Sequence, residues 1–143
     1  MRLLLSAAAL ALAMPAFAAD GVTTYATEDS FKDAAFAVEN AIVGRGLVID
    51  YVSHVGEMMA RTKDDVGGMK DLFSQADVFL FCSAVVSRSV MEADAMNIAH
   101  CPYGVFVTEM DGQVVIGHRD MPDGAMQEVQ TLLDDIAREA AGQ

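Results

Sequence analysis

The stretch from Val78 to Met110, VFLFCSAVVSRSVMEADAMNIAHCPYGVFVTEM, holds the features around which the rest of the chain is organised. Its ends, Val78–Ser83 and Gly104–Met110, are apolar runs of the kind typical of strands. Between them, Ser87–His100 contains an arginine, two acids, an asparagine and a histidine, and the stretch also holds both cysteines of the chain. If the chain has a chemical site, we expect it between these two predicted strands.

The clearest local structure overlaps the end of that stretch. Asp111-Gly112 stands between Gly104–Met110 and Gln113–Arg119, and this dipeptide between apolar runs is typical of a two-residue hairpin turn. The predicted cross-strand pairs are Met110 with Gln113, Glu109 with Val114, Thr108 with Val115, Val107 with Ile116, Phe106 with Gly117 and Val105 with His118. If the strand extends back through Pro102, Cys101 has the same parity as Val105, so Cys101 and His118 would lie toward one face.

The first half of the chain reads as strand, helix, strand. Strands are expected at Val22–Tyr25 and Leu47–Val52. A helix is predicted after Ser30, whose hydroxyl can accept a hydrogen bond from the backbone N–H of Asp33. Its apolar face at helical spacing consists of Phe31, Ala34, Ala35, Val38, Ala41 and Ile42. Gly44 and Gly46 then end it.

The rest of the chain adds helices around the hairpin. The predicted helical segments are a short helix over 53–61, one or two turns at Lys70–Gln75, a helix at Val85–Ala95 and a final helix at Ala125–Ala141. Asn97–Pro102 is expected to be a loop, because proline cannot continue a regular helix. The order predicts an α+β fold, an antiparallel sheet with helices packed on one face.

The first eighteen residues have the pattern of a secretory signal peptide. Arg2 is basic, Leu3–Met14 is apolar apart from Ser6, and Ala16-Phe17-Ala18 places small residues at the positions needed for cleavage. The apolar run is shorter than the ~20 residues that span a membrane. We therefore expect cleavage after Ala18, a single domain over 19–143, and a periplasmic or secreted location.

The charge balance limits the partners of the chain. Its formal net charge is −12, so its net field repels nucleic acid and anionic lipid. We expect no nucleic-acid partner and no membrane association after signal cleavage. An unknown small molecule and a periplasmic redox partner remain open.

Cys82 and Cys101 are the only cysteines, in a chain expected to enter an oxidising compartment. The first interpretation is a disulfide between them, which would add ~3 kcal/mol in the chain-entropy model. The alternative is a thiolate pair that cycles between thiol and disulfide or binds copper or haem. The chain has no CxxCH motif for covalent haem and no CxxC motif for thioredoxin-like chemistry. No cofactor is therefore predicted, and copper and haem stay as alternatives.

Histidines add a further metal hypothesis. His100 adjoins Cys101 and His118 is expected near it, so Cys82, Cys101, His100 and His118 are the candidate ligands of zinc or copper. None of the paired spacings typical of such sites is present. The metal therefore stays undefined at this stage.

Catalysis finds little support in the sequence. There is no Gly-x-Ser-x-Gly elbow, and no catalytic residue is predicted. A ligand pocket is instead expected around six residues, and these are Cys82, Arg88, Asn97, His100, Cys101 and Tyr103. In it Arg88 would hold an anion, while Asn97 and Tyr103 would orient it.

Several motifs of the chain resemble the domain-of-unknown-function 302 family. The motifs are Phe81-Cys82-Ser83-Ala84, Ser87-Arg88, Met91-Glu92-Ala93-Asp94, Asn97-Ile98, Cys101-Pro102-Tyr103 and Gly46-Leu47-Val48. The resemblance implies a TATA-box-binding-protein-like fold, in the order strand, helix, four strands and helix, here with an inserted helix, and often a homodimer. It supplies no reaction, although exported members suggest a link with redox or sulfur metabolism. Members often have proline soon after the first cysteine, whereas Ser83-Ala84 stands there in this chain.

Two functions follow from these observations. The first is an exported binding or accessory protein without an established reaction, more in keeping with a non-enzyme than with an enzyme. The second is a redox or metal protein that uses Cys82 and Cys101.

Overall fold

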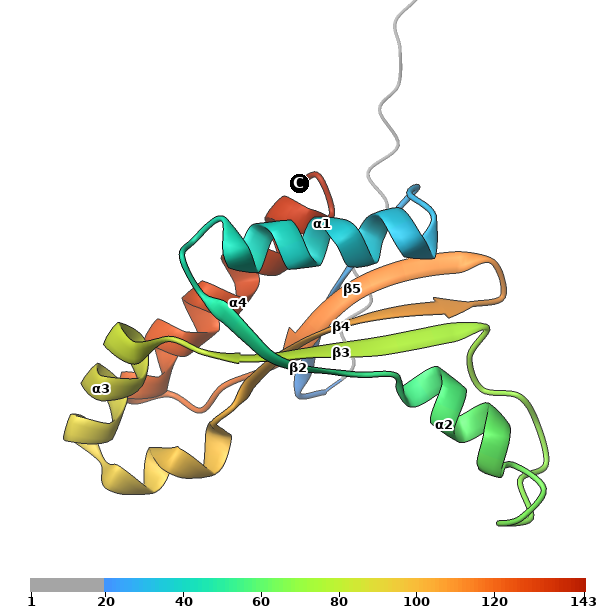
Figure 1. Cartoon of the computed structure of the whole chain (residues 1–143). Helices are drawn as coiled ribbons and strands as arrows, with labels where there is room; N and C mark the ends of the chain where they lie inside the picture. Colours follow the sequence, from blue (N-terminus) through green and yellow to red (C-terminus); the bar gives the residue numbers. More distant parts are fainter. Residues whose placement is uncertain (1–19) are drawn as a thin grey trace, which may run out of the picture.

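A five-stranded antiparallel sheet forms the centre of the molecule, and two long helices lie on one of its faces (Figure 1). The computed structural model describes residues 20–143, so the predicted signal peptide and its cleavage site lie outside the described residues. The strands are β1 Val22–Thr27, β2 Val48–Ser53, β3 Gln75–Cys82, β4 Tyr103–Met110 and β5 Gln113–Arg119, in the spatial order β1-β5-β4-β3-β2.

Among residues 20–143, four α-helices and two 3-10 turns lie between or after these strands. They are α1 Phe31–Val43, α2 Val55–Thr62, α3 Ala84–Ala93, η1 Ala95–His100, η2 Gly124–Met126 and α4 Gln127–Ala140. The predicted α+β class is confirmed. Relative to the order strand, helix, four strands and helix, the chain has added helices between β2 and β3 and between β3 and β4. Within residues 20–143, no helix is long and apolar enough to cross a membrane.

The predicted hairpin and its register are confirmed. Asp111 and Gly112 both adopt positive φ, at 52° and 77°, which is the geometry that two-residue turns between twisted strands require. All six predicted cross-strand pairs of β4 and β5 are present, including Val105 opposite His118. A two-residue turn leaves only one register, so the sequence decides this part of the sheet locally.

The helix α1 also forms as its sequence pattern predicts. The hydroxyl of Ser30 accepts a hydrogen bond from the backbone N–H of Asp33 at 3.2 Å. Five of the six predicted apolar-face residues are buried, namely Phe31, Ala34, Val38, Ala41 and Ile42. Their common face packs toward the sheet and α4.

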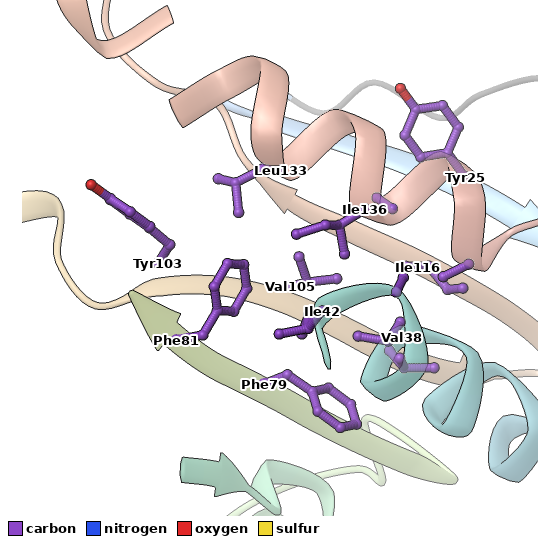
Figure 2. Packing of buried hydrophobic residues seen from close by; sticks show 14 of the residues in the cluster. Tyr25, Val38, Ile42, Phe79, Phe81, Tyr103, Val105, Ile116, Leu133 and Ile136 are labelled. Carbon is purple, nitrogen blue, oxygen red and sulfur yellow. The ribbon is translucent and has the colours of Figure 1, made fainter. Parts of the chain in front are cut away.

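The hydrophobic core lies between the sheet and this helical layer. Alternate residues of β3 and β4, such as Phe81 and Val105, point toward the helices and are fully buried. Leu133 and Ile136 of α4 meet them from above (Figure 2). The ring of Phe81 contacts that of Tyr103 edge-on, with centroids 6.4 Å apart, a favourable arrangement for two aromatic rings.

The opposite face of the sheet carries no helix over its middle (Figure 1). Val78, Leu80 and Phe106 point to this side and stay partly exposed. Phe106 lies over Gly117, where an added Cβ would come within 2.5 Å of the ring. Gly117 therefore allows the Phe106 side chain to lie flat on this uncovered face.

Two predicted segments differ from the structure. The helical turns expected at Lys70–Gln75 are wrong, because Gln75 already belongs to β3 and pairs with Glu109. The loop expected at Asn97–Pro102 is also wrong in part, since η1 extends to His100. It begins at Asp94, whose carboxylate accepts from the backbone N–H of Met96 at 2.9 Å.

Candidate functional site

The two cysteines lie side by side at one end of the sheet. Phe81 pairs with Tyr103 across β3 and β4, so Cys82 and Cys101 come together just beyond this pair. Their thiols are within hydrogen-bonding reach of one another, and the backbone N–H of Tyr103 donates to the sulfur of Cys82. Both thiols are free and partly exposed.

The surroundings of Cys82 favour its neutral thiol. Burial, the neighbouring Cys101 and the carboxylate of Asp50 raise the pKa of Cys82 to about 12, against a smaller opposing effect of the Tyr103 N–H. Because the thiolate is the nucleophilic form of cysteine, Cys82 is a poor attacking group near neutral pH. Cys101 is also partly buried, because it packs in part against the hydrophobic core, but unlike Cys82 it lines a hollow as well.

The predicted meeting of the two cysteines thus occurs, without a covalent bond between them. The structure holds two thiols, so the Cys82–Cys101 disulfide stays a prediction. The two side chains are close enough for each to affect the ionisation of the other.

A hollow of about 380 Å³ opens beside Cys101 on the uncovered face of the sheet. We call it the Cys101 hollow. Val78, Leu80 and Phe106 form its apolar floor, and the residues His100, Cys101 and Arg119 also line it. A volume of this size is in the range of small-molecule sites.

The six residues predicted to form a pocket do not converge on one hollow. Arg88 is exposed on α3 and pairs with Glu92 at 3.5 Å. The Asn97 amide donates to the carbonyl of Val90 at 2.8 Å and so ties η1 to α3. Tyr103 is buried, with its hydroxyl 3.0 Å from that of Ser87. Of the predicted set, His100 and Cys101 line the Cys101 hollow.

Cys101 packs against the core on the side of the sheet where His118 is buried, as their shared parity predicts, but the two residues are not neighbours. His118 pairs with Val105, and Cys101 lies four residues farther along, or ~13 Å at the rise of a strand. His118 is fully buried beneath α4, where its Nε2 lies 3.6 Å from the carboxylate of Asp134. Among residues 20–143 no group of three or more His, Cys, Asp and Glu is arranged to hold a metal ion.

Asp134 instead organises a polar cluster on the covered face. It accepts hydrogen bonds from the Tyr25 hydroxyl and from Arg138, the latter at 2.8 Å. The Arg138 guanidinium also lies 4.9 Å from the centre of the Tyr25 ring. Burial acts to raise the pKa of Asp134, but the bonds from Tyr25 and Arg138 outweigh it and lower the pKa overall. This cluster joins β1 to α4 and has a structural role.

Arg119 and Asp50 are the functional candidates that the sequence analysis missed. Arg119 is the last residue of β5, and Asp50 interrupts the regular pairing of β2 with β3. The alternation of β3 and β4 could have identified Leu80 and Phe106 as a second apolar face. Nothing local could have shown that Arg119 and His100 stand around the same hollow, because 19 residues separate them.

Comparisons with known proteins agree with this fold. A family model described as "Domain of unknown function DUF302" matches residues 23–143. The crystal structure of an uncharacterized conserved DUF302 protein from Bacillus stearothermophilus is similar to the chain, with a TM-score of 0.63 and 15% sequence identity. The similarity covers 87% of this chain and 95% of the Bacillus chain. No curated protein matches the chain.

Proposed function

The chain belongs to the DUF302 family, and because this membership assigns no reaction, we propose a function from the thiol pair. We propose that the protein is an exported accessory protein in which Cys82 and Cys101 cycle between two thiols and a disulfide. The observation that carries the proposal is that two free thiols lie within hydrogen-bonding reach of one another, one at the end of β3 and the other two residues before β4.

The two sulfurs differ in ways that suit different steps. Cys101 lines a hollow and can be reached by a small molecule. Cys82 does not line the hollow, and its pKa is raised to about 12 by burial, by Cys101 and by Asp50. Cys101 is therefore the attacking thiol in this proposal, and Cys82 is the resolving thiol.

A small-molecule disulfide is the oxidant class that the cycle requires. The Cys101 thiol gives up its proton, its sulfur attacks one sulfur of the disulfide, and one small thiol leaves with a proton. Cys82 then loses its proton as it attacks the Cys101 sulfur of this mixed disulfide, and the second small thiol leaves. Two protein thiols are oxidised to one disulfide, while one small disulfide is reduced to two thiols.

Single cysteine variants test the assignment of roles. Reduced Cys82→Ser protein exposed to oxidised glutathione should accumulate glutathione on Cys101, because no second thiol resolves it. Cys101→Ser protein should be modified more slowly by at least about tenfold, since burial and Asp50 still raise the pKa of Cys82 when Cys101 is absent. Intact-mass measurement over time distinguishes the two. Equal rates in both variants would contradict the assignment.

The exported location has a separate test. Protein recovered from the space outside the cytoplasmic membrane should begin at Ala19, as N-terminal sequencing would show. A chain that still begins at Met1 in that fraction, or that occurs only in the cytoplasm, would contradict export.

Copper(I) binding by the same thiols is a second candidate, favoured by the arrangement of two sulfurs without a third metal-binding group among residues 20–143. Thiolates select soft ions such as copper(I), and zinc sites have four ligands as a rule. Reduced protein should then take one equivalent of copper(I) from a competing chelator, and Cys82→Ser should abolish this uptake. Equal uptake by the variant would exclude the pair as the site.

A further inference from the structure

We infer that the Cys101 hollow is a binding site for small organic anions with an apolar body, such as aryl or alkyl carboxylates and sulfonates. The proposal goes beyond thiol cycling and does not depend on it. The Cys82 side chain is not among the residues that line the hollow, so the site persists whether or not the cysteines react.

The floor of the hollow suits an apolar group. Val78, Leu80 and Phe106 present their side chains on the uncovered face of the sheet. Gly104 lies between them, where an added Cβ would be 3.3 Å from Leu80 and 3.4 Å from Val78. Because Gly104 has no side chain, the space above these residues stays open. Burial of a ligand's apolar body there would contribute ~25 cal/mol per Å².

The charge of the lining suits an anion. In a chain with 21 acidic and 9 basic residues, the described residues that line the hollow include one arginine, one histidine and no acid. An anionic group can therefore approach the hollow without meeting a carboxylate on its wall. This contrast with the rest of the chain is the main argument for the ligand class.

Arg119 is free to bind such an anion. Arg45, Arg88 and Arg138 each pair with a carboxylate at 3.5 Å or less, whereas Arg119 has no ion-pair partner among residues 20–143. Guanidinium groups bind carboxylates and sulfonates through two parallel hydrogen bonds.

His100 provides a second polar group beside the hollow. Its Nδ1 is buried, and within the described part of the chain it has no hydrogen-bond partner. The imidazole therefore adds a polar side chain, but no carboxylate, to the residues around the hollow.

The probe 8-anilinonaphthalene-1-sulfonate combines an apolar aryl body with one anionic group. It should bind the full chain with one saturable site and enhanced fluorescence. The neutral probe N-phenyl-1-naphthylamine has a similar body without the anion and should bind more weakly. Gln in place of Arg119 should weaken binding of the anionic probe about tenfold, and should leave binding of the neutral probe unchanged.

Two further variants separate the site from general surface effects. Gly104→Val fills the hollow and should reduce binding of both probes about tenfold or more, while a thermal melt checks that the fold remains. Arg88→Gln removes an equally charged side chain outside the hollow and should change nothing. Equal affinity of wild type and Arg119→Gln for the anionic probe would overturn the inference. Binding of the probes by Gly104→Val as tightly as by wild type would also overturn it. So would a loss of probe binding as the protein concentration rises, because it would show that a dimer covers the hollow.

Discussion

The two faces of the sheet are built from the same strands and differ in almost every physical respect. The face under α1 and α4 buries Phe81, Val105 and Ile116 completely. The other face, one residue away along each strand, leaves Leu80 and Phe106 partly exposed and bordered by a hollow. On β3 and β4, every second side chain near the middle of the sheet therefore goes to a closed core, whereas Val78, Leu80 and Phe106 between them stay partly exposed.

This difference suggests how the chain divides its tasks. On the covered face even the charged groups are paired, as Asp134 is with Tyr25 and Arg138. On the uncovered side Arg119 has no ion-pair partner among residues 20–143, and at the end of the sheet two thiols meet without forming a bond. Paired polar groups stabilise a fold, whereas polar groups without partners are available to bind or react.

The largest effect should come from replacing Phe81 by alanine. Replacement of its neighbour Leu80, on the other face, is the matched comparison. Phe81→Ala empties the closed core and should lower the free energy of unfolding by about 3–5 kcal/mol. Leu80→Ala alters a partly exposed side chain and should cost about 1 kcal/mol or less. Urea unfolding measures both. Similar losses in the two variants would show that the uncovered face is packed as tightly as the core.

A smaller loss is expected from the polar cluster under α4. Tyr25→Phe removes the hydroxyl that donates to Asp134 and should cost about 1 kcal/mol, because a partly buried acceptor loses a partner. Tyr51→Phe is the matched control, since Tyr51 is 63% exposed and should change the free energy of unfolding little. An unchanged stability in Tyr25→Phe would remove the structural role given to the cluster.

The free energy of unfolding at alkaline pH should report on Tyr25 and Cys82 together. The pKa of Tyr25 is raised from 10.0 to about 12, mainly by burial and by Asp134, and that of Cys82 from 9.0 to about 12. In both cases the folded protein favours the neutral form of the side chain. The stabilisation is complete below the pKa that the group has in the unfolded chain, and it is lost as the pH rises through the pKa that the group has in the folded protein. The free energy of unfolding should therefore fall between pH 9 and about 12. Tyr25→Phe and Cys82→Ser should each flatten part of this fall, and identical profiles in all three proteins would contradict it.

The smallest effect is expected outside both faces. Arg88 and Glu92 form an exposed pair on α3, and Arg88→Gln should cost about 0.5 kcal/mol or less. Thermal or urea unfolding of this variant measures the loss of stability. A loss well above that value would mean that Arg88 makes contacts beyond the pair with Glu92.

Local signals were sufficient for part of the fold. The Asp111-Gly112 turn fixes its own register, and the Ser30 cap with its following apolar face specifies α1, because all the interacting residues are close in sequence. The local sequence of Lys70–Gln75 predicts helical turns, but Gln75 pairs with Glu109 of β4, and this long-range strand pairing determines the structure there. Intrinsic preference is overridden by such tertiary pairing.

The candidate site shows the same limit more sharply. Both cysteines were predicted to meet because they flank a strand–helix–strand unit, and they do. The proposed ligand set around Arg88 did not form, since helix α3 directs Arg88 to solvent. Arg119 could not be found from the sequence, because its place beside His100 depends on how the ends of β5 and η1 meet on the uncovered face.

The central claim is that the two adjacent thiols form a reversible pair, and a redox titration tests it most directly. Protein equilibrated with defined ratios of reduced to oxidised glutathione should lose both thiols together, form a Cys82–Cys101 disulfide confirmed by peptide mass, and regain both thiols when the ratio is reversed. A pair that stays reduced at every ratio, or a disulfide that no ratio reopens, would contradict the claim.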